Sequence, residues 1–277
     1  MSVIGFCTPA IALDGAAEIT VSPDGRSAYV ASSASDAVVT FDRAGGGRLI
    51  QKPGPAACLS DSGAGRCRDG TALDAPASVA VSPDGNSAYV ASQFSNAVAV
   101  FDRLRNGKLV QKPGSAGCIS DTGAGPCVDG TALDQADSVT VSPDGQSVYV
   151  TSLNSNAVAV FDRASDGSLV QKPGLLGCIS DTGAGPCVDG TALDGAESVT
   201  VSPDGENAYV TSASTFAPGN SDAVVVFDRA GDGTLTQKPG TAGCISETGI
   251  GRCVDGAGLD GAASAAVSPD GRSAYAA

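Results

Sequence analysis

Residues 138–151 read Ser-Val-Thr-Val-Ser-Pro-Asp-Gly-Gln-Ser-Val-Tyr-Val-Thr, and this stretch decides the fold. Two β-prone runs, 138–141 and 147–151, flank Ser142-Pro-Asp-Gly145, which has proline at the second position of a turn and glycine at its last. The second run alternates in the way that a half-buried strand does. The stretch therefore predicts two strands joined by a tight turn.

The same turn recurs along the chain at spacings of 60, 60, 60 and 66 residues. It begins at Ser22, Ser82, Ser142, Ser202 and Ser268. Each complete unit continues with a third and a shorter fourth β-prone run, for example 157–161 and 168–171. Four consecutive antiparallel strands in a repeated unit are typical of a propeller blade. We therefore expect an all-β fold, a single β-propeller domain over residues 1–277. The expected parts are four blades at about 17–52, 77–112, 137–172 and 197–238, and a half blade at 262–277.

Three motifs of the unit carry a family resemblance. They are Val-Ser-Pro-Asp-Gly-x-x-x-Tyr-Val-(Ala/Thr)-Ser, then Ala-Val-x-Val-Phe-Asp-Arg, then Gly-x-Leu-x-Gln. This pattern resembles the YVTN-type and lactonase-like β-propeller repeats, and it covers essentially the whole chain. The resemblance implies a seven-bladed ring with shorter units. Because the last unit stops after its second strand, we expect this chain to be part of a larger propeller; the alternative is a chain of four and a half units that closes as a small ring or pairs with a second copy. The resemblance also implies a possible lactonase activity, although propellers carry many unrelated functions.

The cysteines follow the repeat as well. A long connection after each blade opens and closes with a cysteine nine residues apart, in the pairs Cys58 and Cys67, Cys118 and Cys127, Cys178 and Cys187, and Cys244 and Cys253. Zinc sites use other spacings, and the chain has no histidine, so we favour four local disulfides over metal ligation or reduced thiols. Cys7 is left without a partner. Disulfides indicate an oxidising compartment, so we expect an extracellular, periplasmic or cell-surface protein whose signal sequence is not in this chain.

The amino-acid composition argues against several classes of function: nucleic-acid binding, membrane insertion and catalysis that requires histidine. With 16 Lys and Arg against 30 Asp and Glu, the chain has a net charge of −14, which would repel nucleic acid and anionic lipid. No apolar stretch approaches the length of a membrane span. The absence of histidine excludes Ser-His-Asp and Cys-His catalysis. We expect no nucleic-acid partner and no insertion into a membrane.

Blade connectivity places the loops between the second and third strands on the same rim as the cysteine connections. Polar residues of this rim are the candidate ligand-binding set: Asp36, Asn96, Asn154, Asn156, Phe216, Asp222, Asp121 and Asp181. The loop 120–130 has oxygen ligands that could hold Ca²⁺, but it lacks the spacing of an EF-hand loop. Asp and Gly are also what tight turns require, so a purely structural role is the stronger interpretation. We expect no cofactor other than this possible Ca²⁺.

No catalytic constellation is apparent among the repeated residues. The only large deviation is the insertion at 214–219, which contains no acid or base. We therefore expect an exported, non-enzymatic scaffold or binding module that presents an acidic rim to a protein or glycan partner, with self-association through the open half blade as a further possibility. The alternative is a lactonase-like hydrolase of sugar lactones, of the 6-phosphogluconolactonase type, implied by the family resemblance. In that case Asp or Glu would activate water, and Arg or a metal would polarise the carbonyl.

Overall fold

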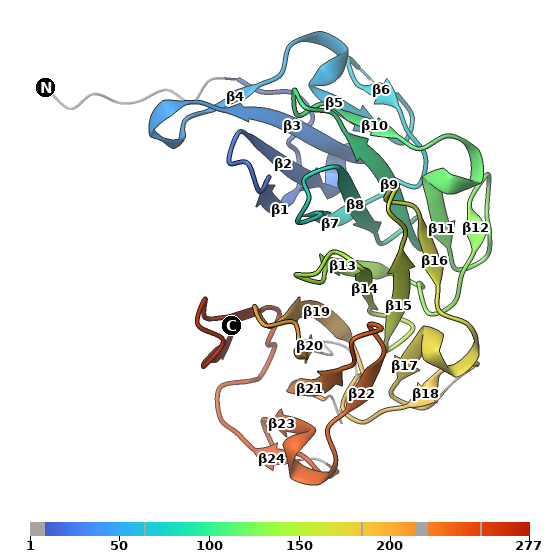
Figure 1. Cartoon of the computed structure of the whole chain (residues 1–277), viewed down its shortest axis with the longest axis vertical. Helices are drawn as coiled ribbons and strands as arrows, with labels where there is room; N and C mark the ends of the chain where they lie inside the picture. The colour runs from blue at the N-terminus through green and yellow to red at the C-terminus, as the bar shows by residue number, and fades with distance from the viewer. Residues whose placement is uncertain (1–8, 64, 184, 214–220, 250) are drawn as a thin grey trace, which may run out of the picture.

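The computed structural model describes residues 9–63, 65–183, 185–213, 221–249 and 251–277. Four six-stranded sheets and one two-stranded sheet follow one another along the chain. They form an arc in which the first strand of each sheet lies on the inner, concave side (Figure 1). The all-β propeller fold, with four blades and a partial fifth, is confirmed.

Each blade uses the same strand order. The first blade contains β1 (Ala16–Val21), β2 (Ser27–Ser32), β3 (Ala37–Arg43), β4 (Leu49–Gln51), β5 (Cys58–Ser60) and β6 (Arg68–Asp69). The second contains β7 (Pro76–Val81), β8 (Ser87–Ser92), β9 (Ala97–Arg103), β10 (Leu109–Gln111), β11 (Cys118–Ser120) and β12 (Val128–Asp129). The third contains β13 (Ala136–Val141), β14 (Ser147–Ser152), β15 (Ala157–Arg163), β16 (Leu169–Gln171), β17 (Cys178–Ser180) and β18 (Val188–Asp189). The fourth contains β19 (Ala196–Val201), β20 (Asn207–Ser212), β21 (Ala223–Arg229), β22 (Leu235–Gln237), β23 (Cys244–Ser246) and β24 (Val254–Asp255).

The half blade consists of β25 (Ala265–Val267) and β26 (Ala274–Ala276), which pair with each other. The described helices are short 3-10 turns between strands: η1 (Ser33–Ser35), η2 (Gly45–Gly47), η3 (Gly54–Ala56), η4 (Gly114–Gly117), η5 (Gly174–Gly177) and η6 (Gly240–Ala242).

The outer strand of each of the four complete blades is interrupted, which the sequence did not reveal. In the first blade β4 and β5 both pair antiparallel with β3, at its two ends, and residues 52–57 loop out between them. Pro53 has no N–H to donate, and Gly54 has a φ of +59° that suits glycine. The short β6 then adds in parallel to β5. Each sheet therefore extends well beyond the range expected from the sequence, and the first cysteine of each pair lies within a strand.

The repeated turn has the structure that its residues predict. The Ser142 hydroxyl donates to Asp144 Oδ1 at 2.5 Å and accepts from the Ser147 N–H at 3.0 Å. Gly145 has a φ of +71°, a conformation that other residues rarely adopt. These bonds satisfy the turn internally and join the first two strands of the blade.

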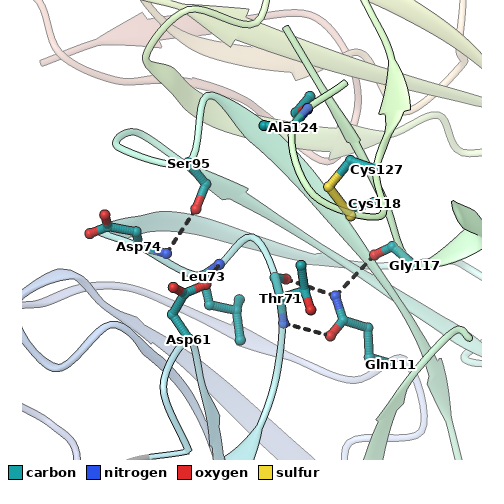
Figure 2. Close-up of a disulfide and its surroundings, with 11 residues drawn as sticks. Asp61, Thr71, Leu73, Asp74, Ser95, Gln111, Gly117, Cys118, Ala124 and Cys127 are labelled. Carbon is teal, nitrogen blue, oxygen red and sulfur yellow. Dashed lines mark hydrogen bonds between the residues drawn. A yellow bond between two sulfur atoms is a disulfide. The ribbon is translucent and has the colours of Figure 1, made fainter. Parts of the chain in front are cut away.

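The long connections are fastened at two places. The four predicted disulfides are all present, as Cys58–Cys67, Cys118–Cys127, Cys178–Cys187 and Cys244–Cys253. Figure 2 shows the second of them beside the Gln111 side chain, which donates to the Thr71 carbonyl and accepts from the Thr71 N–H, each at 2.8 Å. A side chain of the second blade thus forms hydrogen bonds to the connection that precedes that blade along the chain. Cys7 lies outside the described residues.

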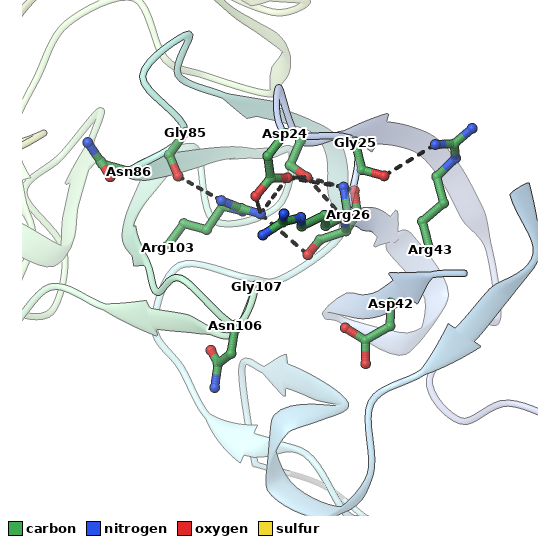
Figure 3. A network of polar contacts seen from close by, with 12 residues as sticks. Asp24, Gly25, Arg26, Asp42, Arg43, Gly85, Asn86, Arg103, Asn106 and Gly107 are labelled. Atoms are coloured by element: carbon green, nitrogen blue, oxygen red, sulfur yellow. Dashed lines mark hydrogen bonds and ion pairs between the residues drawn. The ribbon is translucent and has the colours of Figure 1, made fainter. Parts of the chain in front are cut away.

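Neighbouring blades are joined by one arginine network. Arg103 of the second blade donates to the Tyr29 hydroxyl at 2.7 Å, to Asp24 at 2.9 Å and to the Gly85 carbonyl at 3.0 Å. Figure 3 shows Arg103 with Asp24 and Gly85. Tyr29 in turn donates to the Gly107 carbonyl at 2.8 Å. The same network recurs as Arg163 with Asp84 and Tyr89, and as Arg229 with Asp144 and Tyr149.

Apolar cores fill the space between the blades. The core between the second and third blades contains Tyr89 and Val98 from one side and Val139 and Phe161 from the other. Six of the repeated aromatic residues are fully buried, as their spacing suggests: Tyr29, Tyr89, Tyr149, Phe101, Phe161 and Phe227. Tyr209 is only partly buried, and Tyr275 in the half blade is exposed. The blade stack is thus held by apolar packing and closed at one rim by the arginine network.

Candidate functional site

Four of the predicted rim residues lie at one equivalent place in the four blades. Asp36, Asn96, Asn156 and Asp222 each precede the third strand and have positive φ values of 32° to 49°. Their side-chain oxygens accept backbone N–H groups of the connection into the next blade, from Ala75, Gln135, Gly195 and Gly261 respectively. The structure therefore brings them to one rim, as predicted, but uses these oxygens to attach blades.

The remaining predicted residues lie at different places in the blades. Asp121 and Asp181 accept the N–H groups of Leu133 and Leu193 at 2.9 and 2.8 Å, which braces the cysteine connections. Asn154 is exposed between β14 and β15, and Phe216 lies outside the described residues. Among the residues that the structure describes, no cluster of three or more carboxylate or thiol side chains has the arrangement of a metal site.

Two carboxylates that were not among the predicted residues occupy the same rim. In the pairing of β13 with β14, Ala136 faces Ser152 and Ser138 faces Thr151, which leaves Asp137 as an extra residue in a bulge. Glu197 occupies the identical bulge of β19 in the next blade. Bulges re-aim side chains and are frequent beside active sites. Both carboxylates thus belong to inner strands of adjacent blades.

Asp137 has an environment that favours its neutral form. Its Oδ1 accepts from Gln93 Nε2, which reaches across from the β8–β9 loop of the second blade. Burial raises the pKa of Asp137 to about 6, and the negative charge of Glu18 adds to this, whereas the Gln93 hydrogen bond opposes it. Asp137 is therefore mostly ionised at neutral pH but titrates close to it.

The pKa of Glu197 is raised in the same direction. Burial, and then the negative charge of Asp137, raise the pKa of Glu197 to about 7. The Thr151 hydroxyl donates to the Glu197 carbonyl oxygen at 2.8 Å, which fixes the backbone of this bulge against the third blade. Carboxyl groups with pKa values near neutrality are suited to proton transfer, whereas the turn aspartates Asp24 and Asp84, with pKa values lowered to about 2, are not.

Glu18 has a structural contact in addition to its charge. Its Oε2 accepts from the Val79 N–H at 2.9 Å. At the equivalent place Ser78 accepts from the Val139 N–H, and Ser138 from the Val199 N–H. Glu18 therefore replaces a serine that links inner strands, and we assign it to the surroundings of the pair rather than to the pair itself.

A comparison of the units column by column would have found these two residues. The bulge position is Ala17 and Ala77 in the first two blades, then Asp137 and Glu197. The half blade has Ala263 at this position of the repeat. Because the change affects single residues inside strands, it is much less conspicuous than the insertion at 214–219, which lies outside the described residues.

The fold defines a class, a β-propeller with disulfide-fastened connections. The sequence model of the family described as lactonase, 7-bladed β-propeller, matches residues 71–174. The predicted resemblance to lactonase-like propeller repeats is thereby confirmed. The matched segment includes the second blade and most of the third, with Gln93 and Asp137 among its residues.

Several solved structures share the fold. Hydrazine synthase of Kuenenia stuttgartiensis is 19% identical with a TM-score of 0.58, and the alignment covers 98% of this chain and 57% of that one. A Bacteroides fragilis protein that bears the name 6-phosphogluconolactonase is 16% identical with a TM-score of 0.59, covering 93% and 61%. The periplasmic gluconolactonase of Pseudomonas aeruginosa is 23% identical with a TM-score of 0.54, covering 79% and 52%. The chain thus spans between about half and three fifths of these structures, and at such identities the likeness concerns the fold.

Proposed function

We propose that this propeller belongs to a hydrolase of lactones, with Asp137 and Glu197 as its acid–base pair. The observation that carries the proposal is the placement of these two carboxyl groups, with pKa values raised to about 6 and about 7, in equivalent bulges of adjacent inner strands. The match to the lactonase propeller family over residues 71–174 supports the reaction class.

The two groups suit the two proton transfers of ester hydrolysis. In the proposed reaction ionised Asp137 removes a proton from the attacking water, which forms a bond to the lactone carbonyl carbon. Protonated Glu197 gives its proton to the ring oxygen as the carbon–oxygen bond breaks, and the product is the open hydroxy acid. Both pKa values are raised toward neutrality, so near neutral pH one carboxyl group can be ionised while the other carries the proton. The step needs only water and the two side chains, so we propose no resident cofactor.

Activity measurements with paired variants test the proposal. Asp137→Asn and Glu197→Gln should each lower kcat for glucono-δ-lactone by about 10²–10⁴-fold. Glu206→Gln, an exposed acid beside a repeated turn, is the matched control and should retain full activity. The kcat of the unchanged protein should rise and fall around neutral pH. Equal activity of all three variants, or hydrolysis that never exceeds the spontaneous rate, would reject the proposal.

The expectation of a non-enzymatic binding module loses its main support. It depended on uniform repetition without a blade-specific reactive group, and the third and fourth blades differ from the others at that very bulge. The polar rim oxygens suggested for a protein or glycan partner are engaged with backbone N–H groups instead. The lactonase alternative is therefore the better supported function.

Four disulfides indicate an oxidising compartment. We propose a location outside the cytoplasm, in the periplasm, at the cell surface or in the extracellular space. No helix of the described residues is long and apolar enough to cross a membrane. Thiol labelling of the protein recovered from its native cells would test the location, since alkylation of the eight paired cysteines before any reduction would contradict it.

A further inference from the structure

Three arginines line one cavity between the first and second blades. The cavity has a volume of about 270 Å³. The repeated turn of the first blade contributes Arg26 to its lining, and the second blade contributes Arg103, at the end of β9, and Arg105, two residues later. Figure 3 shows Arg26 beside Arg103 and Asp24 at this junction. In a chain with a net charge of −14, three guanidinium groups around one cavity form a local positive region.

Two of these arginines have no acidic partner. Arg103 is paired with Asp24 at 2.9 Å, and Asp84, the other acid of the cavity, is paired with an arginine of the third blade at 2.8 Å. Among the described residues, Arg26 and Arg105 have neither an ion pair nor a side-chain hydrogen bond. The carboxylates of the cavity are therefore already neutralised. Two guanidinium groups, each with a fork of N–H donors, are left to bind an anion.

This pair of arginines departs from the repeat. At the two equivalent positions, the next junction has Asn86 and Ser165, and the one after it has Gln146 and Gly231. The turn position of Arg26 is exposed in all four complete blades, although the second, third and fourth each have a preceding blade beside them. A neighbouring blade does not cover this position, so the exposure of Arg26 is a property of the turn itself.

We propose that this cavity binds a tetrahedral dianion, a phosphate or sulfate group, through Arg26 and Arg105. A guanidinium group binds such an anion through two parallel N–H···O hydrogen bonds, and two guanidinium groups balance its two charges. The backbone segments that hold the two arginines are fixed to each other, because Arg103 ties the turn of the first blade to β9 through Asp24 and Tyr29. The site is thus assembled before the anion binds, which lowers the entropic cost of binding.

This site is separate from the proposed hydrolytic site. The bulge with Asp137 lies at the start of β13, where Ala136 faces Ser152, whereas the repeated turn follows the end of the same strand at Val141. The bulges and the turns therefore lie at opposite rims of the blades. Anion binding and lactone hydrolysis can be tested independently, since a variant at one rim leaves the residues of the other rim unchanged.

Phosphorus NMR of inorganic phosphate, titrated with the protein at about pH 8 and low salt, measures binding directly. Arg26→Gln and Arg105→Ser should each raise the dissociation constant by about tenfold or more, because each removes one charged donor group. Serine is the residue of the third blade at the Arg105 position, and both arginines are exposed, so circular dichroism should show an unchanged fold. Arg252→Gln, at an exposed arginine of the fourth blade, is the matched control and should bind phosphate as tightly as the unchanged protein.

Competition experiments test the charge of the anion. Sulfate should displace phosphate, whereas acetate, with one charge and a planar group, should displace it at least tenfold less well. At about pH 5 phosphate is a monoanion and sulfate remains a dianion, so phosphate binding should weaken and sulfate binding should persist. The anion with the lower dissociation constant at pH 7 then identifies the natural ligand as a phosphate or a sulfate compound.

Three results would overturn the proposal. The first is the absence of saturable phosphate and sulfate binding by the unchanged protein. The second is binding that either Arg26→Gln or Arg105→Ser leaves unchanged, because the site requires both guanidinium groups. The third is acetate competing as well as sulfate, which would show an unselective positive surface.

Discussion

Arg103 and Arg43 occupy the same position of the repeat but have different neighbours, so replacing each in turn measures how much a blade junction contributes to stability. The Arg103 side chain is only 5% exposed. Replacing it with methionine keeps most of the aliphatic stem and removes the guanidinium. The change removes hydrogen bonds to the buried Tyr29 hydroxyl and to the Gly85 carbonyl. Each contributes about 1 kcal/mol net. Asp24 is 37% exposed and regains water, so its ion pair adds at most about 1 kcal/mol.

We therefore expect Arg103→Met to lower the free energy of unfolding by about 2–4 kcal/mol in total. Arg43→Met is the matched control, because Arg43 is exposed and bonded to Gly25, and its cost should remain under about 0.5 kcal/mol. Urea unfolding followed by circular dichroism measures both values. Equal losses for the two variants would refute the idea that the arginine acts through its neighbouring blade.

The stability difference between Arg103→Met and the unchanged protein should decrease at acidic pH. The Ser22 hydroxyl, the Arg26 N–H and Arg103 together lower the pKa of Asp24 from 3.8 to about 2, against the effect of burial. A carboxylate with a lowered folded-state pKa stabilises the protein above its unfolded pKa, and this contribution is lost as pH falls toward the folded value. The difference between Arg103→Met and the unchanged protein should therefore shrink between about pH 4 and pH 2. A difference that is constant over this range would exclude the ion pair as part of the effect.

Three further outcomes are expected. Replacing Cys118 and Cys127 together with alanine should lower the free energy of unfolding by about 2–3 kcal/mol, because the ten-residue loop gains freedom in the unfolded chain; urea unfolding of the double variant measures this. Asp137→Asn should lower the pKa of Glu197, because the negative charge that raises it is removed, and carboxyl NMR titration should show the downward shift. Since the folded pKa of Asp137 is raised from 3.8 to about 6, its ionisation destabilises the fold as pH rises through this interval. Asp137→Asn should therefore stabilise the protein by about 1–3 kcal/mol at pH 8 and by nearly nothing at pH 4, as measured by unfolding at the two pH values.

Features that depend on local chemistry were predictable from the sequence. The Ser-Pro-Asp-Gly turn is self-sufficient, since Ser142, Asp144 and Gly145 satisfy it within five residues. The fixed spacing of the cysteines made local pairing the favoured interpretation, and the four disulfides confirm it. Repetition then extended each local inference to every blade.

Features that depend on contacts between blades were not predictable in this way. Asp36 and Asn156 read as free polar rim residues because their hydrogen-bond partners lie 39 positions further along the chain, in the connection to the next blade. Asp137 interacts with Gln93, which is 44 positions away, and its raised pKa exists only once the blades are stacked. Loop composition alone cannot distinguish a ligand-binding oxygen from one that accepts a distant backbone N–H.

The repeat itself supplies a criterion for where function lies. A residue type that recurs with the same neighbours at each junction between blades has the role of building that junction, as Arg103 and Asp24 do. A single catalytic site needs groups that one or two blades alone possess, and Asp137 and Glu197 meet this condition at a position where other units have alanine. Departure from the repeat is not sufficient, because Glu18 also departs and yet accepts the Val79 N–H as a serine would. What separates the pair from Glu18 is burial, which raises the pKa of each toward neutrality and destabilises the fold at the pH where an acid–base catalyst must work.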